Sequence, residues 1–322
     1  MKKTILFVAT GGTISAEMDS KIHGYISKQS GEDLISGLDL KDHQVETINF
    51  RKINSPYMTP SDMLELGKLL KDTLKRKEIK GAVVTHGTAT LEETAFLLDM
   101  LLDTRNPVVL TGSQRPASAQ WPDGPSNLSS AFRIACDPLA VDQGVLLAFA
   151  DRIYIGREVN KIHSTALEAF AGGEVGFVYP DRVIIKGTRR ERFCLRWPAE
   201  ALPSVDIIPF YSGADGKYFR AALAAGISGL VVESLGMGNV NKDYYEGIKE
   251  AREAGLTVVL TTRCPYGRVV PYYGYPGGGA SLKKLGVVFG GSLSSAKARM
   301  FLMIALAAGY DKGELQNIFD NL

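Results

Sequence analysis

The sequence has little of several features that mark other classes of protein. It contains three cysteines, Cys136, Cys194 and Cys264, an odd number without the spacing of a metal site. They argue against a disulfide framework and favour a reducing, cytoplasmic setting. The four histidines are scattered along the chain and form no pair spaced as metal ligands. We therefore expect no metal site.

Long apolar runs and an excess of one charge are also missing. The longest apolar stretch, Met300 to Ala308, is far shorter than the roughly 20 residues of a membrane-spanning helix. The apolar segment Ile5 to Thr10 is too short for the core of a signal peptide. The 37 basic and 35 acidic residues leave a net charge of +2, without the clustered Lys and Arg that nucleic acids require. We expect binding to neither membranes nor nucleic acids.

What the chain does contain is a repeated alternation of short apolar strands and helical segments. At 322 residues, with 45% hydrophobic and 22% charged residues, it is long enough for two globular domains. The alternation predicts an N-terminal, flavodoxin-like αβ domain with a parallel sheet and a hairpin extension at 1–188. A smaller parallel αβ domain is predicted at 206–322. Residues 189–205, with arginines, prolines and no periodicity, are predicted to be the linker.

Residues 81–94 predict a strand that leads into an active-site turn. Ala82 to Val84 have the apolar character of a buried strand, and Thr90 with Glu93 predicts a capping box at the start of the next helix. His86 to Ala89 then lie at the carboxyl end of a strand. Ligands of open parallel sheets bind at that edge, so these residues are candidates for a site.

Three other segments have recognisable patterns. The first predicted strand ends in Gly11-Gly12, whose glycines allow a tight turn that exposes the hydroxyl of Thr13. The G-x-G-x-x-G spacing is missing, so we expect no dinucleotide cofactor. Residues 15–31, polar and glycine-containing around Tyr25, are predicted to form a mobile loop of the length typical of lids. The sequence Thr59-Pro60-Ser61-Asp62 predicts a helix with Thr59 as its N-cap.

Threonine is the recurring polar residue at these strand ends. A G-x-S-x-G elbow and a histidine in a suitable motif are missing, which argues against a serine-hydrolase triad. A threonine hydroxyl needs a base to act as a nucleophile, and Lys161 is the available amine if burial lowers its pKa. Thr13 and Thr88 are therefore candidates for chemistry. The alternative interpretation is that both are ordinary turn and capping residues.

Five separated segments carry a more specific signal. They are Ala9-Thr10-Gly11-Gly12-Thr13-Ile14, Thr85-His86-Gly87-Thr88 with Leu91-Glu92-Glu93-Thr94, Gly112-Ser113-Gln114-Arg115-Pro116, Asp123-Gly124-Pro125 with Asn127-Leu128, and Lys297-Ala298-Arg299. In this order and at these intervals, the segments resemble the bacterial-type L-asparaginase and glutaminase-asparaginase family. The resemblance runs along the whole chain.

The resemblance implies a hydrolase that cleaves the side-chain carboxamide of L-asparagine or a related small-molecule amide through a threonine ester. Thr13 corresponds to the nucleophile and Tyr25 to the lid tyrosine that assists it. Thr88 and Lys161 correspond to a proton relay. The residues implied to bind the substrate are Gly12, Ser55, Gly87, Ala89 and Ser113. No cofactor is implied.

The resemblance also implies finer roles for some of these residues. Ser55 corresponds to a residue that holds the α-carboxylate, and Ser113 to one whose carbonyl faces the amide. Backbone amides of the Gly11-Gly12 turn would stabilise the oxyanion. The family further implies a homodimer or homotetramer in which a neighbour's second domain completes each site.

The sequence departs from the family at Ala89. The family motif is His-Gly-Thr-Asp-Thr, and its aspartate binds the substrate's α-ammonium and touches the relay. Tyr57 stands where many members have an acidic residue, and the loop 272–279 has tyrosines and glycines but no acid. Three interpretations remain: an asparaginase disabled at one position, an amidase for N-substituted asparagine, N-substituted glutamine or other amides without a free α-ammonium, or a ligand-binding protein.

Overall fold

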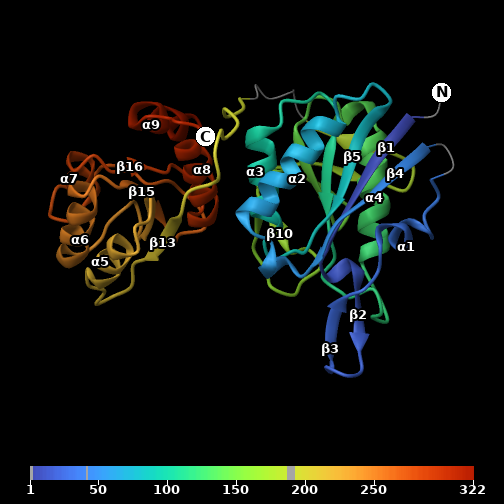
Figure 1. Ribbon diagram of the computed structural model, residues 1–322, viewed down its shortest axis with the longest axis horizontal. Coiled ribbons are helices and arrows are strands. Elements are labelled where there is room, and N and C mark those ends of the chain that lie inside the picture. The colour runs from blue at the N-terminus through green and yellow to red at the C-terminus, as the bar shows by residue number, and fades with distance from the viewer. Residues whose placement is uncertain (1–2, 41–42, 187–192) are drawn as a thin grey trace. The chain divides into compact units, whose positions relative to one another are not determined.

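The chain forms two compact units, Met1–Cys194 and Leu195–Leu322. The computed structural model describes residues 3–40, 43–186 and 193–322. Each unit has a sheet with helices packed on both faces, and the sheet of the first unit is the larger (Figure 1). The predicted linker begins in residues that lie outside the described ranges, so the domain limits given above stay a prediction.

The first unit is built on an eight-stranded sheet with the order β12-β11-β8-β7-β6-β5-β1-β4. Its strands are β1 Lys3–Gly11, β4 His43–Ile53, β5 Ile79–Thr85, β6 Val108–Thr111, β7 Val145–Phe149, β8 Arg152–Ile155, β11 Glu174–Val178 and β12 Val183–Ile185. The parallel strands β4-β1-β5-β6-β7 follow the 2-1-3-4-5 order of flavodoxin-like folds. Strands β8, β11 and β12 pair antiparallel and form the predicted hairpin extension.

Helices cover both faces of this sheet (Figure 1). They are α1 Gly31–Ile35, α2 Pro60–Thr73, α3 Leu91–Leu101 and α4 Gly124–Cys136. Helices α1 and α4 pack on one face, where the rings of Phe7 and Phe132 lie 5.6 Å apart, and α2 and α3 cover the other. The central strands are therefore buried on both faces, which explains their unbroken runs of Val, Ile and Leu.

The second unit has a four-stranded parallel sheet in the order β13-β14-β15-β16. Its elements are β13 Val205–Pro209, α5 Lys217–Ala224, β14 Gly229–Ser234, α6 Lys242–Glu253, β15 Thr257–Thr262, α7 Gly279–Lys284, β16 Val288–Phe289, α8 Ser295–Ala307 and α9 Lys312–Asn321. Helices α5, α6 and α7 pack around Tyr244 on one face, and α8 and α9 lie on the other. The predicted fold class is confirmed for both units. Elements β16 and α7 are too short for a periodic pattern to predict.

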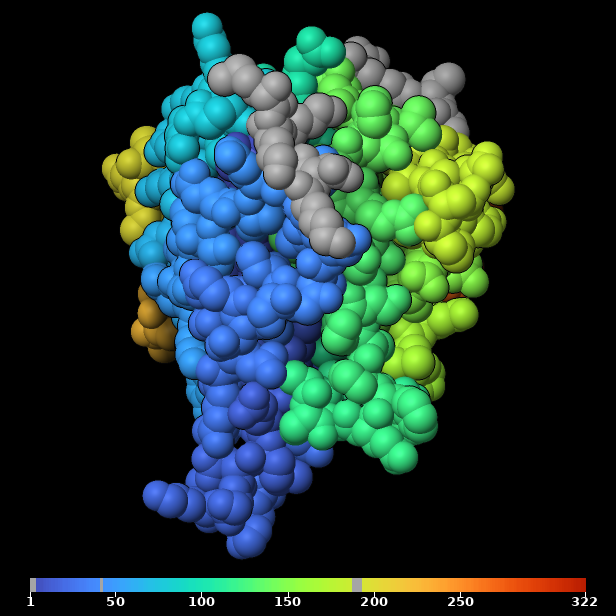
Figure 2. All heavy atoms as spheres, turned by 90° about the vertical axis from the view of Figure 1, so that its right-hand side faces the viewer, coloured from blue at the N-terminus to red at the C-terminus, as the bar shows by residue number. Residues whose placement is uncertain are grey.

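The segment predicted as a mobile loop, 15–31, is mainly a β-hairpin. Strand β2 Ala16–Asp19 pairs antiparallel with β3 Gly24–Ser27, and the hairpin projects from the first unit (Figures 1 and 2). Its base is fixed because the amides of Lys28 and Gln29 donate to the carbonyl of Ser15 at 2.8 and 3.1 Å. The remaining short elements are η1 Thr13–Ser15, η2 Ser55–Tyr57, η3 Pro138–Ala140, β9 Asn160–Lys161 and β10 Phe170–Ala171.

The two predicted helix starts had different outcomes. Thr59 caps α2 as predicted, because its hydroxyl accepts from the amide of Asp62 at 3.1 Å and the Asp62 carboxylate accepts from the amide of Thr59 at 3.0 Å. The capping box predicted for Thr90 and Glu93 is wrong. Within the described residues the Thr90 side chain caps no amide, and its hydroxyl donates to the carbonyl of Ser55 at 3.0 Å. A distant acceptor thus displaces the local interaction.

Candidate active site

The ends of β1, β5 and β6 meet at residues that have no side chain. A Cβ on Gly12, whose φ is +84°, would lie 2.5 Å from the Cα of Gly87. One on Gly87 would lie 2.5 Å from the Cβ of Ser55, and one on Gly112 would lie 2.4 Å from the carbonyl oxygen of His86. Ordinary contact with a Cβ begins at 3.4 Å. Glycine is therefore what allows these segments to approach so closely.

Thr13 and Thr88 flank this contact, since each follows one of the touching glycines. Thr13 begins η1 and is half-buried, and Thr88 is buried. No described residue accepts a hydrogen bond from the backbone amide of Thr13 or of Thr88. The amide of Gly12, one of the predicted oxyanion donors, is instead engaged with the carbonyl of Ile53 at 2.9 Å. The amides of Thr13 and Thr88 are thus available to a ligand at this edge, whereas that of Gly12 is not.

Thr88, Lys161 and Gln114 form a hydrogen-bonded group beside the contact. Lys161 Nζ donates to Thr88 Oγ1 at 2.7 Å, and Thr88 Oγ1 donates to Gln114 Oε1 at 3.1 Å. Lys161 Nζ also donates to Gln114 Oε1 at 3.3 Å. Burial lowers the pKa of the Lys161 amine, and the negative charge of Glu92 opposes this effect. The structure therefore brings the predicted relay pair together.

Gln114 is a member of this group that the sequence did not identify. It lies inside the segment 112–116, which contributes to the family resemblance, but nothing in the segment distinguishes its side chain. Asp123 fixes its backbone, because the Asp123 carboxylate accepts from the amides of Gln114 and Arg115 at 3.0 and 2.8 Å. Ser113, in the same loop, is buried, and its hydroxyl donates to the carbonyl of Arg115 at 2.8 Å.

Ser55 connects residues 87–90 to the start of α2. The amide of Ala89 donates to Ser55 Oγ at 3.2 Å, and the hydroxyl of Thr90 donates to the Ser55 carbonyl. Ser55 is buried, whereas Ala89 is exposed. Tyr57, on η2 two residues after Ser55, is 72% exposed. The structure thus places Ala89 against Ser55, with solvent access at position 89.

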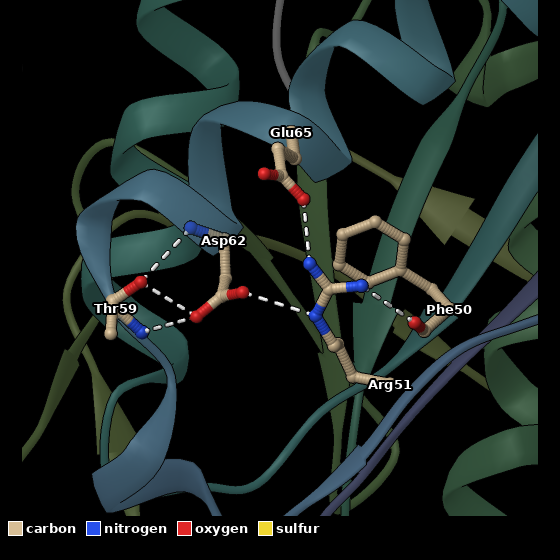
Figure 3. Close-up of polar contacts among 5 residues, drawn as sticks. All are labelled: Phe50, Arg51, Thr59, Asp62 and Glu65. Carbon is tan, nitrogen blue, oxygen red and sulfur yellow. Dashed lines mark hydrogen bonds and ion pairs between the residues drawn. The ribbon is translucent and has the colours of Figure 1, made fainter. Parts of the chain in front are cut away.

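Arg51 bonds to residues on the far side of the connection between β4 and α2, the segment that contains Ser55 (Figure 3). Its guanidinium donates to Asp62 at 3.0 Å and to Glu65 at 2.6 Å, which joins the end of β4 to the first turns of α2. Burial raises the pKa of Asp62, but hydrogen bonds from Thr59 and Arg51 outweigh it and bring that pKa below its ordinary value. Ser55 is therefore held by a short connection with two anchored ends.

His86 supports the turn and does not supply a base. Its side chain is fully buried, with Nδ1 2.9 Å from the carbonyl oxygen of Gly87 and Nε2 3.0 Å from the hydroxyl of Thr94. A carbonyl can only accept, so Nδ1 carries the proton and Nε2 accepts from Thr94. Burial lowers the pKa of His86 to about 4, despite the hydrogen bond with Gly87, so the ring is neutral at pH 7.

Tyr25 is a predicted site residue that the structure leaves apart from the others. It lies on β3 opposite Met18, is 46% exposed, and its hydroxyl has no hydrogen-bond partner among the described residues. Figure 2 shows the hairpin that carries it projecting beyond the body of the first unit. Ser27, at the base of β3, bonds to the Ser15 hydroxyl at 2.5 Å, so the hairpin is attached to η1, which begins at Thr13.

The described ranges hold no group of three or more His, Cys, Asp or Glu that could bind a metal ion. Cys136, Cys194 and Cys264 carry thiols rather than disulfides. In the part of the chain that the structure describes, every helix is too short or too polar to cross a membrane.

A hydroxyl bonded to a half-buried amine, beside unpaired backbone amides at the carboxyl edge of a parallel sheet, suits a hydrolase that works through a covalent ester. Residues 4–188 match the family described as asparaginase, N-terminal, and residues 204–319 match the glutaminase/asparaginase C-terminal domain. The fold and the sequence therefore indicate the same class.

Individual proteins agree with these matches. The chain is 35% identical to L-asparaginase of Bacillus licheniformis, over 97% of this chain and 98% of that protein. It is 31% identical to L-asparaginase 2 of Escherichia coli, over 98% of this chain and 92% of that protein. A crystal structure of a probable cytoplasmic L-asparaginase from Campylobacter jejuni is similar with a TM-score of 0.87 and 30% identity, covering 99% of each chain. The chain belongs to the asparaginase family and is an asparaginase-like amidohydrolase.

Proposed function

We propose that this protein hydrolyses the side-chain carboxamide of L-asparagine, or of a closely related small-molecule amide, through an ester on Thr13. The 2.7 Å hydrogen bond between Lys161 and Thr88 carries this proposal, because it lies beside the glycine contact that brings Thr13 to the same edge. Relatives named glutaminase-asparaginase, one of them 29% identical, make glutamine the nearest alternative amide.

The reaction has two steps. The Thr13 hydroxyl attacks the carboxamide carbon, the bond from Oγ1 to carbon forms, and the carbon–nitrogen bond breaks. The nitrogen leaves as ammonia after it takes up the proton from the hydroxyl. Water then attacks the ester, which releases the carboxylate and restores the Thr13 hydroxyl. The unpaired amides of Thr13 and Thr88 are suited to hold the oxyanion in both steps.

Protons in this scheme pass through the two threonines and Lys161. The half-buried amine of Lys161, whose pKa is lowered, exchanges a proton through Thr88. Tyr25 assists Thr13 when the hairpin closes over the substrate. That role requires movement, since the Tyr25 ring is 46% exposed and its hydroxyl bonds to no described residue.

The substrate is held by Gly12, Ser55, Gly87, Ala89 and Ser113. The Ser55 hydroxyl accepts a hydrogen bond from the amide of Ala89, which leaves its own hydrogen to donate to an α-carboxylate. Gly12 and Gly87 let the backbone approach the ligand closely, and the Ser113 carbonyl accepts from the amide group of the substrate.

Ammonia release from asparagine tests the nucleophile. Thr13→Ala removes the hydroxyl, and we expect kcat to fall about 10⁴-fold or more. Thr13→Ser is the matched control, because it keeps a hydroxyl at the same position, and it should retain measurable turnover and form an ester that mass spectrometry detects after an acid quench. Full activity in Thr13→Ala would overturn the proposal.

Ala89 and Tyr57 favour a second candidate, an amidase for N-substituted asparagine or glutamine. Ala89 supplies no charge for an α-ammonium, and Tyr57 presents an exposed ring two residues from Ser55. A substituent on the α-nitrogen removes the positive charge and adds apolar surface that an aromatic ring can cover.

Ala89→Asp separates these candidates. A hydrogen bond to a charged group is worth about 1.5–3 kcal/mol, so the variant should raise kcat/KM for free asparagine about 10- to 150-fold if asparagine is the substrate. If N-acyl asparagine is the substrate, the variant lowers its turnover and leaves asparagine a poor substrate. If neither chain releases ammonia while asparagine raises the melting temperature, the protein only binds its ligand.

We also propose a cytoplasmic homotetramer, or a homodimer, with sites completed by a neighbour. The three thiols support the location, and exposed rings of Tyr272, Tyr273 and Tyr275, with successive centroids 5.2 and 6.0 Å apart, support a covered surface. Light scattering should give about two or four times the mass of one chain. A fully active monomer would contradict shared sites.

A further inference from the structure

The side-chain amide of Gln114 is held at both ends. Its Oε1 accepts from Thr88 at 3.1 Å and from Lys161 at 3.3 Å, while its Nε2 donates to the carbonyls of Ala166 and Ser164 at 3.0 and 3.4 Å. Flipping the amide would turn its NH₂ group towards an ammonium that can only donate, and its oxygen towards two carbonyls that can only accept. The chemistry of the partners therefore fixes Oε1 on the Lys161 side.

Three separate elements meet at this oxygen atom. Gln114 follows β6, Thr88 follows β5, and Lys161 ends β9. The backbone of Gln114 is fixed independently, because its amide donates to the Asp123 carboxylate, which also accepts from Asn127 at 3.0 Å. Gln114 can therefore orient the amine and the hydroxyl without itself being displaced.

Position 89 cannot make the same contact. Ala89 follows Thr88 directly, but its methyl group neither accepts a hydrogen bond nor carries a charge. Glu92, the charged group that acts on the amine, accepts from the backbone amide of Lys161 rather than from Nζ. We propose that Gln114 is a positioning residue of the relay, whose neutral Oε1 orients the Lys161 amine and the Thr88 hydroxyl, a role that rests on the proposed function.

A neutral acceptor and a carboxylate affect the amine differently. A carboxylate within hydrogen-bond distance stabilises the ammonium form and raises the pKa of a neighbouring amine by about one to three pH units. The amide of Gln114 orients Nζ without adding a negative charge. Burial of Lys161 then lowers its pKa with only Glu92 in opposition, so the amine accepts a proton closer to neutral pH.

Gln114→Glu is the sharpest test, because it keeps the shape of the side chain and exchanges the amide for a carboxylate. We expect the pKa of Lys161, followed by NMR of isotope-labelled lysine, to rise by about one to three pH units. The part of the pH profile in which kcat rises with pH should shift to higher pH by the same number of pH units. Below that pH range kcat falls about 10- to 1000-fold, and it recovers at high pH.

Two further variants separate charge from orientation. Gln120→Glu adds the same charge at an exposed position of the same loop, and it should leave both the pH profile and the pKa of Lys161 unchanged. Gln114→Met keeps the volume but removes the acceptor. We expect it to lower kcat about 10- to 100-fold at every pH, with little change in KM, because the amine and the hydroxyl lose their orientation.

The inference and the proposed function can fail separately. An active Thr13→Ala variant overturns the proposed function, while the NMR titration of Lys161 still reports on Gln114. If Gln114→Glu changes neither the pKa of Lys161 nor the pH profile, the role of Gln114 is wrong even where Thr13→Ala is inactive. A uniform loss of kcat in Gln114→Glu without a shift along the pH axis would indicate a purely structural residue and would also overturn the inference.

Discussion

Gly12→Ala tests whether the strand ends meet through a contact that only glycine permits. With φ +84° and ψ −176°, Gly12 occupies a region that is almost restricted to glycine, and a side chain there costs about 1–3 kcal/mol. The new methyl group would lie 2.5 Å from the Cα and 2.6 Å from the nitrogen of Gly87, backbone atoms that cannot rotate away. Overpacking of this kind costs about a further 1–3 kcal/mol.

The free energy of unfolding should therefore fall by about 2–6 kcal/mol in Gly12→Ala, a large part of the roughly 5–15 kcal/mol of a typical domain. Urea unfolding followed by circular dichroism measures this loss. Gly37→Ala is the matched control in the same unit, because its φ is not positive and a Cβ there meets no heavy atom within 4 Å. It should change stability by no more than about 0.5 kcal/mol.

Gly213→Ala, in the second unit, separates the cost of the backbone conformation from the cost of overpacking. Gly213 has φ +81° with open space around it, so its substitution carries the conformational cost alone, about 1–2 kcal/mol. If Gly12→Ala unfolded at the same urea concentration as the unsubstituted chain, the backbone would be able to yield at no cost. That result would refute the reasoning that glycine is required for Thr13 and Thr88 to share one edge.

Three other substitutions follow from the structure. Thr59→Ala removes the cap of α2, so it should lower the free energy of unfolding, measured in urea, by about 1 kcal/mol. Ser61→Ala, at an exposed position of the same turn, should change it little. Equal effects of the two substitutions would contradict the capping role of Thr59. His86 binds a proton below about pH 6.5 when the chain is unfolded, but only below about pH 4 when it is folded. The free energy of unfolding should therefore decrease by up to about 3 kcal/mol as the pH is lowered from about 6.5 to about 4. If a His86→Gln chain showed the same decrease, His86 would be excluded as its cause. Tyr25→Phe should lower kcat by about a hundredfold or more without changing the melting temperature, and unchanged kcat would remove Tyr25 from the mechanism.

Sequence patterns predicted structure well where the interacting groups are close along the chain. Thr59 and Asp62 are three residues apart, and their capping box forms as expected. Thr90 and Glu93 have the same spacing, yet the Thr90 hydroxyl bonds to a carbonyl 35 positions away at Ser55. Spacing describes the local competition alone, so a tertiary acceptor of this kind cannot be anticipated from it.

The candidate site shows the same limit more strongly. Thr88 and Lys161 are 73 positions apart, so no local pattern predicts their contact, and their pairing depends on the residue types and on the family resemblance. Gln114, 47 positions from Lys161, remained unidentified because its importance depends on which way a folded loop turns its amide. Residues 15–31 were predicted as a loop because the hairpin turns at His23, with φ +50°, without the Asn-Gly sequence that marks tight hairpins.

The hairpin formed by β2 and β3 separates a fixed base from an exposed tip. The base is bonded to Ser15, the last residue of η1, which begins at Thr13. Residues Ser20 to His23, at the tip, are exposed. Exposed tips tolerate insertions and changes of composition that a buried sheet does not. The tip can therefore be lengthened or changed in composition without disturbing the strand ends that hold the threonines.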